Sequence, residues 1–142
     1  MVQKITSKKV PIERRKTFFP DLFTPQFFVL GEANLYDTAT QLSKDYHGGL
    51  WDFVQLSNEG GFAYPYGPKE FNIYVPGNGY QDTLEPETFG IICTLFALSN
   101  TCIQAFNLKI RAANEVLADR YHALRDYVAQ RPDRRIIMAS ID

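Results

Sequence analysis

The sequence predicts an α+β fold: a single compact domain in which a small three-stranded antiparallel meander packs with about four helices. The length of 142 residues suits one hydrophobic core, so we expect residues 1–142 to form one domain. Hydrophobic side chains make up 45% of the chain and charged ones 22%, as in ordinary globular proteins. Segments with helical periodicity precede and follow a central stretch of short alternating segments, and this order is typical of α+β proteins.

The amino-terminal segment begins with charge and continues with aromatic side chains. Residues 1–9 show no apolar stretch of the kind found in secretory signals, and we expect a flexible basic arm there. Pro11 suits the first turn of a short helix. Residues 18–25 combine three Phe side chains with Pro20 and Pro25, and this spacing predicts a turn that directs the rings inward.

An amphipathic helix is predicted over residues 31–46. Apolar side chains recur at intervals of three and four, which places them on one face of a helix: Leu35, Ala39, Leu42 and Tyr46. The pair Gly48-Gly49 follows, and glycine after a last turn commonly ends a helix.

Three strands are predicted in the middle of the chain, over residues 50–56, 62–66 and 71–75. Each segment alternates side chains between two faces. Residues 58–61 (Asn-Glu-Gly-Gly) have strong turn chemistry, because Asn and Gly adopt positive φ at low cost. The segments are consecutive and closely spaced, so we expect them to pair as an antiparallel meander.

Two further helices are predicted in the carboxy-terminal half. One covers residues 85–106: Pro86 suits the first helical position, and residues 89–106 are apolar on most sides. We expect this helix to be buried. Residues 114–130 carry one apolar stripe and end before Pro132. Residues 134–142 are a short apolar tail with a terminal acid, to which no element is assigned.

The charge distribution argues against two classes of protein. Fifteen basic and sixteen acidic side chains give a net charge of −1, which disfavours both a surface that coats nucleic acid and one that mimics DNA. The charge is uneven, however, because residues 1–16 carry +5 and residues 32–87 carry −7. The basic segment is either a solvated terminus or a contact for nucleic acid or an acidic partner.

Membrane and redox signals favour a cytoplasmic protein. Polar side chains interrupt the apolar runs before they approach the roughly 18–20 residues that span a bilayer, so we expect no membrane segment. Cys93 and Cys102 lie in an apolar region and match no zinc signature. We interpret them as free thiols in a reducing cytoplasm.

Catalytic and metal-binding patterns are weak. His47 or His122 could act as a base with Asp45 or Asp52 as its orienting group, and Ser57 or a cysteine could serve as nucleophile, but no spacing in the sequence fixes such a triad. No histidine or cysteine spacing indicates a metal site, and no glycine-rich loop indicates a phosphate site. We therefore expect no enzyme activity, no cofactor and no metal.

Several motifs resemble the ArdB/KlcA antirestriction family. The most specific is Tyr46-His47-Gly48-Gly49-Leu50-Trp51, followed by an aromatic strand and an Asn-Gly-Gly type of turn in which Glu59 is an extra residue. The resemblance continues through residues 77–80, 90–98 and 119–126 and reaches the closing residues 139–142. The segment 14–23, with Arg14 and its aromatic side chains, is also similar to the family's amino-terminal stretch.

The resemblance implies a compact cofactor-free protein that inhibits type I restriction–modification systems and protects incoming plasmid or mobile-element DNA. The expected partner is a type I restriction–modification enzyme or its DNA complex, with no membrane and no small-molecule substrate. Candidate partner-binding residues lie near turns, where binding groups tend to cluster, or at the acidic end: Tyr46, His47, Asn58, Asn78 and Asp142. The alternative is a small nucleic-acid-associated regulator that binds through its basic amino-terminal arm.

Overall fold

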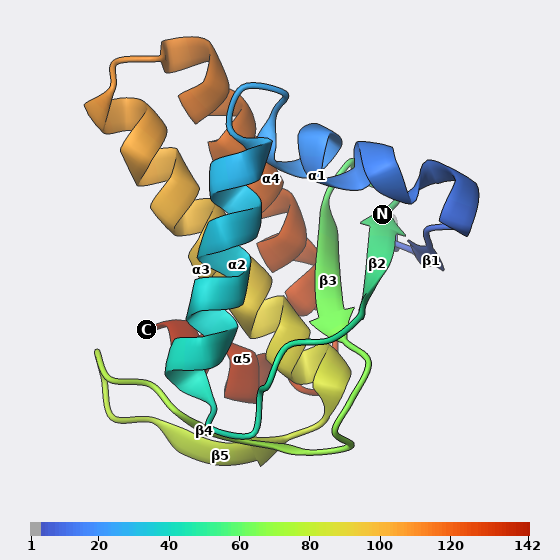
Figure 1. Cartoon of the computed structure of the whole chain (residues 1–142), viewed down its shortest axis with the longest axis vertical. Coiled ribbons are helices and arrows are strands. Elements are labelled where there is room, and N and C mark those ends of the chain that lie inside the picture. Colours follow the sequence, from blue (N-terminus) through green and yellow to red (C-terminus); the bar gives the residue numbers. More distant parts are fainter. Residues whose placement is uncertain (1–3) are drawn as a thin grey trace.

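The computed structural model describes residues 4–142, which form one α+β domain (Figure 1). Residues 1–3 of the expected arm lie outside the described residues. Five strands, a short 3-10 helix η1 and five α-helices follow one another along the chain as β1 (Ser7–Lys9), η1 (Ile12–Arg14), α1 (Arg15–Phe23), α2 (Phe28–Leu42), β2 (Trp51–Leu56), β3 (Gly61–Pro65), β4 (Phe71–Tyr74), β5 (Gln81–Leu84), α3 (Pro86–Asn107), α4 (Arg111–Val128) and α5 (Arg134–Ile141).

The strands form two small antiparallel groups. One is a three-stranded sheet in the order β1-β2-β3, and the other is the hairpin β4-β5. The two predicted segments at 50–56 and 62–66 do pair, with Val54 opposite Phe62. The third strand of the sheet is β1, which uses residues of the expected arm and sets Lys9 opposite Val54. The predicted segment 71–75 pairs with β5 instead, because alternation specifies a strand but does not specify its partner.

The predicted turn at residues 18–25 is wrong, because the three Phe side chains and Pro20 lie in the helix α1. α1 continues through Pro20, although proline removes one backbone hydrogen bond from a helix interior. The expectation that the rings point inward is correct, because Phe18 and Phe19 are buried with ring centroids 4.7 and 4.8 Å from that of Phe53. The burial of these rings offsets the lost hydrogen bond. The helix ends at Phe23, and Thr24, which follows it, has φ of +71°.

α3 is the central helix of the domain. It packs against α2, α4, α5 and β3, and Figure 1 shows it passing between α2 and α4. By length and composition alone α3 could cross a membrane, but most of its apolar window is buried inside the domain, as in the core helix of a soluble protein. The approach to β3 is close at Gly90, where a Cβ would lie 2.3 Å from the carbonyl oxygen of Ala63.

A charged network holds the turn between α4 and α5. The guanidinium of Arg131 binds both carboxylate oxygens of Asp133 at 2.9 and 3.0 Å and one oxygen of Glu87 at 2.7 Å. The hydroxyl of Thr88 donates to Asp133 at 2.6 Å. The network joins this turn to the first turn of α3, and the carboxy-terminal tail, which carried no assignment from sequence, follows as α5.

We predict that Gly90→Ala lowers the free energy of unfolding by about 1–3 kcal/mol or more, because the added methyl group would overlap backbone atoms of β3. Urea denaturation measures the change. Gly77→Ala is the matched control, because a Cβ at Gly77 meets no atom within 4 Å. Equal stability of the two variants would contradict the close approach of α3 to β3.

We predict a pH-dependent loss of stability for Asp133→Asn. Burial would raise the pKa of the Asp133 carboxyl, but hydrogen bonds from Arg131 and Thr88 outweigh it and hold the pKa below the usual 3.8. The ionised carboxylate therefore stabilises the fold above that value, and its contribution is lost as the pH falls through the lower folded-state pKa.

At pH 7 the Asp133→Asn variant should lose about 1.5–3 kcal/mol of unfolding free energy, the range for hydrogen bonds to charged groups. The difference from the unmodified protein should shrink in acid below the usual carboxyl pKa. Asp37→Asn, at an exposed position of α2, should show little change at any pH. A difference that stays constant into acid would refute the assignment.

Candidate partner-binding surface

The segment that carries the most specific motif is a loop between α2 and β2. α2 ends at Leu42, four residues earlier than predicted, and the hydroxyl of Ser43 donates to the Asn72 carbonyl oxygen at 2.8 Å. The carboxylate of Asp45 accepts hydrogen bonds from the backbone N–H of Asn72 at 2.8 Å and from its side-chain amide at 3.2 Å. These contacts fix the start of the loop to β4.

Trp51 anchors the other end of the loop. Its side chain is 3% exposed, and its ring N–H donates to the Tyr46 hydroxyl at 3.1 Å. The ring centroids of Tyr36 and Tyr46 lie 5.5 and 5.7 Å from that of Trp51. Burial raises the pKa of Tyr46, so its hydroxyl stays protonated at neutral pH. Tyr46 therefore lies half-buried under the loop as part of its support.

Between these anchors the chain is exposed. Gly48 and Gly49 have φ of +88° and +105°, a backbone region that favours glycine, and this explains the glycine pair of the motif. His47 is exposed, Leu50 is 74% exposed, and Tyr66, whose N–H donates to the Leu50 carbonyl oxygen at 2.8 Å, is 68% exposed. We call His47–Leu50 together with Tyr66 the loop surface.

A buried carboxylate lies next to this surface. Asp52 is buried and pairs with Lys9 at 3.2 Å and with Arg15 at 3.8 Å. The Arg15 guanidinium also donates to the Trp51 carbonyl oxygen and lies 4.4 Å from the centre of the Phe53 ring. Arg15 thus links α1 to the first residues of β2. This role of Arg15 was not predictable from sequence, because no spacing along the chain relates residue 15 to residues 51–53.

The alternative catalytic triad is not assembled in the part of the chain that the structure describes. Asp45 binds Asn72, Asp52 pairs with two cations, and the Ser57 hydroxyl accepts from the Thr6 N–H at 2.9 Å. Neither carboxylate is hydrogen-bonded to a histidine. Within residues 4–142 no group of three His, Cys, Asp or Glu side chains could hold a metal ion.

Asn58 connects the β2–β3 turn to α4. Its amide group donates to the Ala123 carbonyl oxygen at 2.8 Å and accepts from the Gly60 N–H at 3.1 Å. The extra residue of this turn, Glu59, has φ of +71°, and its carboxylate lies 3.7 Å from Arg120 of α4. Both side chains therefore serve the attachment of the turn to the helix, and a role of Asn58 in partner binding stays a prediction.

Asn78 caps the carboxy-terminal helix. Its amide N–H groups lie 3.1, 3.3 and 3.2 Å from the carbonyl oxygens of Ala139, Ser140 and Asp142, while its side-chain oxygen accepts from the Tyr80 N–H at 2.9 Å. Carbonyl groups in the last turn of a helix lack helical partners, and this side chain supplies one. The exposed carboxylate of Asp142 remains available to a partner.

The five candidate residues do not form one site. Asn78 and Asp142 are in direct contact, and Tyr46 and His47 are adjacent in a loop that Asp45 ties to β4, the strand before Asn78. In Figure 1 this loop and the β4–β5 hairpin lie at the lower end of the molecule. Asn58 belongs to the turn at the upper end of the sheet, beyond the far end of β2 (Figure 1).

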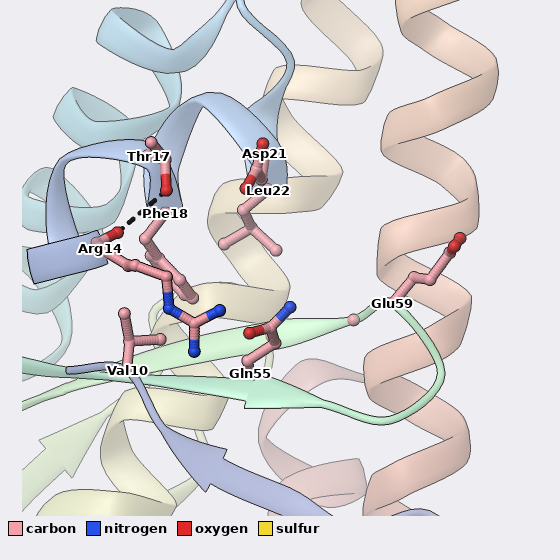
Figure 2. A pocket seen from close by; sticks show the side chains of 10 residues that line it. Val10, Arg14, Thr17, Phe18, Asp21, Leu22, Gln55 and Glu59 are labelled. Carbon is pink, nitrogen blue, oxygen red and sulfur yellow. Dashed lines mark hydrogen bonds between the residues drawn. The ribbon is translucent and has the colours of Figure 1, made fainter.

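A small pocket of about 200 Å³ lies between α1 and the β2–β3 hairpin (Figure 2). Figure 2 shows the guanidinium of Arg14 extended over the sheet toward Gln55, while the carboxylate of Glu59 is directed toward α4. The volume of this pocket is below that of ordinary ligand sites, which are about 300–1,000 Å³. The mixed charge of its rim gives no preference for one ligand, so the pocket adds no candidate activity.

The chain is similar to known antirestriction proteins in sequence and in fold. A sequence profile described as antirestriction protein matches residues 44–142. Two proteins of Escherichia coli named antirestriction protein KlcA are 33% and 34% identical, over 99% and 97% of this chain and 96% and 94% of their own lengths.

A solved structure superimposes with a TM-score of 0.87 at 34% identity, covering 99% of this chain and 96% of the other. It is described as showing a novel fold of the KlcA and ArdB proteins and their antirestriction activity against type I DNA restriction systems in vivo but not in vitro. The ArdB/KlcA resemblance found in the motifs thus extends over the whole fold, and the chain belongs to the antirestriction protein family.

Proposed function

We propose that this protein inhibits type I restriction–modification systems in the cytoplasm and thereby protects incoming plasmid or mobile-element DNA. The observation that carries the proposal is the full-length match, in sequence and in fold, to proteins described as active against type I restriction systems. In this proposal the protein acts by binding, and its membership of a non-enzymatic family supports that mode of action. Its free cysteines, Cys93 and Cys102, are compatible with a reducing compartment.

The proposed mechanism is a specific surface interaction rather than wholesale DNA mimicry. A DNA mimic presents a dense array of unpaired carboxylates, whereas several acidic side chains here are paired with cations. Asp52 is neutralised by Lys9 and Arg15, and Glu59 lies beside Arg120. The acidic segment 32–87 therefore presents fewer free charges than its sequence alone suggests.

The solved relatives are described as active in vivo but not in vitro. For this chain we propose that the target is a component or a state of the restriction complex that cells supply and a purified reaction does not. The direct partner is then the enzyme in its cellular complex with DNA. The loop surface is the proposed contact, because it exposes His47, Leu50 and Tyr66 on a backbone that the buried Trp51 holds in place.

The alternative function, a nucleic-acid regulator acting through the basic arm, receives less support. Lys9 and Arg15, two of the six basic side chains in residues 1–16, form ion pairs with Asp52. Ile5 is hydrogen-bonded through both its N–H and its carbonyl oxygen to the Gln130 side chain. Residues 5–9 are thus attached to the body of the domain.

Expression of the protein should raise the plating efficiency of unmodified phage on cells with an active type I system. The result should be absent in cells that lack the restriction system, where plating is already complete. Methylation of the phage DNA that survives, measured in parallel, should be intact if the block falls on restriction. Unchanged plating at confirmed soluble expression would sink the proposed function for that system.

Replacing the exposed side chains of the loop surface should reduce this protection without unfolding the protein. We expect His47→Ala with Leu50→Asp to restore restriction at least in part, while the melting temperature stays near that of the unmodified protein, because both side chains face solvent. Leu108→Asp is the matched control, since Leu108 is 63% exposed and lies at the α3–α4 turn. Equal loss of protection in both variants would exclude the loop surface as the specific contact.

A further inference from the structure

A groove between α4 and α5 is separate from the surface described above. It has a volume of about 490 Å³ and is lined from α4 by His122, Arg125 and Asp126, from the end of that helix by Ala129, and from α5 by Arg134, Arg135 and Met138. None of these residues was a candidate from sequence, apart from His122 in the rejected triad. The α4–α5 turn that shapes the groove is held by the Arg131 network.

The groove combines an apolar floor with a basic rim. Ala129 and Met138 supply aliphatic surface, while Arg125, Arg134 and Arg135 supply positive charge against the single carboxylate of Asp126. Within residues 4–142 none of these three arginines has a carboxylate within 4.0 Å, in contrast to Arg131, which has two such partners. Arg134 donates a long hydrogen bond of 3.5 Å to the Ala129 carbonyl oxygen, and the Arg125 guanidinium lies 5.9 Å from the centre of the Tyr121 ring. Neither contact neutralises the positive charge, so these guanidinium groups can still donate to an external carboxylate.

The amino-terminal segment extends the same basic region. Gln130 donates to the Ile5 carbonyl oxygen at 2.6 Å and accepts from the Ile5 N–H at 3.1 Å, which places exposed Lys4 near the end of α4. Gln130 also borders the adjoining hollow formed with Arg131, Pro132, Arg134 and Arg135. Basic side chains from the two ends of the sequence thus gather around the α4–α5 turn, although the whole chain carries −1.

We propose that this groove binds an acidic segment of a partner protein, with one apolar side chain seated against Ala129 and Met138 and carboxylates paired with the three arginines. Charge complementarity selects this occupant, because apolar contact at the floor and guanidinium groups at the rim match an amphipathic acidic helix. A nucleic-acid strand fits less well. The groove lining holds one ring that could stack on a base, His122, and no Phe, Tyr or Trp, and its aliphatic side chains offer nothing to a phosphate.

The link from this groove to restriction rests on the function proposed above, but the binding itself does not. Met138 makes the binding directly measurable, since the only other methionine of the chain is Met1. The full-length protein labelled with carbon-13 at the methionine methyl groups therefore gives one reporter inside the groove. The probe is a synthetic helical peptide of Glu, Ala and Leu, about 20 residues long so that it can hold a helix, with leucines at four-residue spacing.

Titration with this peptide should shift the Met138 methyl signal, and added salt should weaken the effect. Arg134→Glu with Arg135→Glu should weaken the binding about tenfold or more, equivalent to about 1.4 kcal/mol. This double variant should still fold, because acidic side chains are favourable in the first turn of a helix. Arg125→Gln provides a second variant on α4 and should weaken binding in the same direction.

Lys109→Glu with Arg111→Glu is the matched control. It makes the same change in net charge at the start of α4, outside the groove, and should bind the peptide as the unmodified protein does. A peptide with Gln in place of every Glu should give no comparable shift. Equal binding of the two peptides, no shift with either, or equal weakening in the control variant would each overturn the proposal.

Two further outcomes would assign the groove to another occupant and also overturn it. A short DNA duplex that shifts Met138 more strongly than the peptide would indicate nucleic acid, and a shift on raising the protein concentration alone would indicate a second copy. In cells, the Arg134→Glu, Arg135→Glu variant should lose phage protection while the control variant keeps it. A Met138 shift in a protein that gives no phage protection would refute the proposed function and leave the groove supported.

Discussion

The packing of α3 across β3 at Gly90 is the constraint on which the rest of the domain depends. Glycine lets the helix approach until a Cβ would lie 2.3 Å from a carbonyl oxygen of the strand. At that distance Thr94, one turn further along, bridges the two elements: it accepts from the Ala63 N–H at 3.2 Å and donates within the helix to the Gly90 carbonyl oxygen at 2.8 Å. α2, α4 and α5 all pack on the helix positioned in this way.

Around this core, hydrogen bonds from polar side chains attach the peripheral elements. Asn58 holds the β2–β3 turn to α4, Asn78 holds the β4–β5 turn to the end of α5, and Gln130 holds the amino-terminal segment to the end of α4. Asn58 and Gln130 use both the donor and the acceptor of a side-chain amide to bind backbone groups. A carboxamide suits this role because it carries two donors and an acceptor and needs no counter-ion.

The two surfaces proposed for binding differ in chemistry. The loop surface has no Asp, Glu, Lys or Arg side chain, and its glycine pair leaves the backbone around exposed Leu50 uncovered. The α4–α5 groove is basic, and within residues 4–142 none of its three arginines has a carboxylate within 4.0 Å. A protein with two such faces can contact two parts of a large assembly.

Local sequence was sufficient wherever periodicity or turn chemistry specified the structure. The stripes of α2 and α4, the apolar run of α3 and the turn at Asn58 each depend on residues within a few positions of one another, so the α+β class and the main elements were predictable. The motif Tyr46–Trp51 was also sufficient to indicate the family. Its two glycines, Gly48 and Gly49, have positive φ, a local backbone conformation that favours glycine and depends on this segment alone.

Only the tertiary structure decided the features that join distant segments. Pro20 is a helix breaker by local rules, yet α1 continues through it because Phe18 and Phe19 pack against Phe53 on another element. The ion contact of Arg15 with Asp52 and the hydrogen bonds of Ile5 with Gln130 likewise join residues far apart in sequence. The physical reason is the same in each case: pairing, ion contacts and burial depend on spatial neighbours, which the pattern of a single segment does not contain.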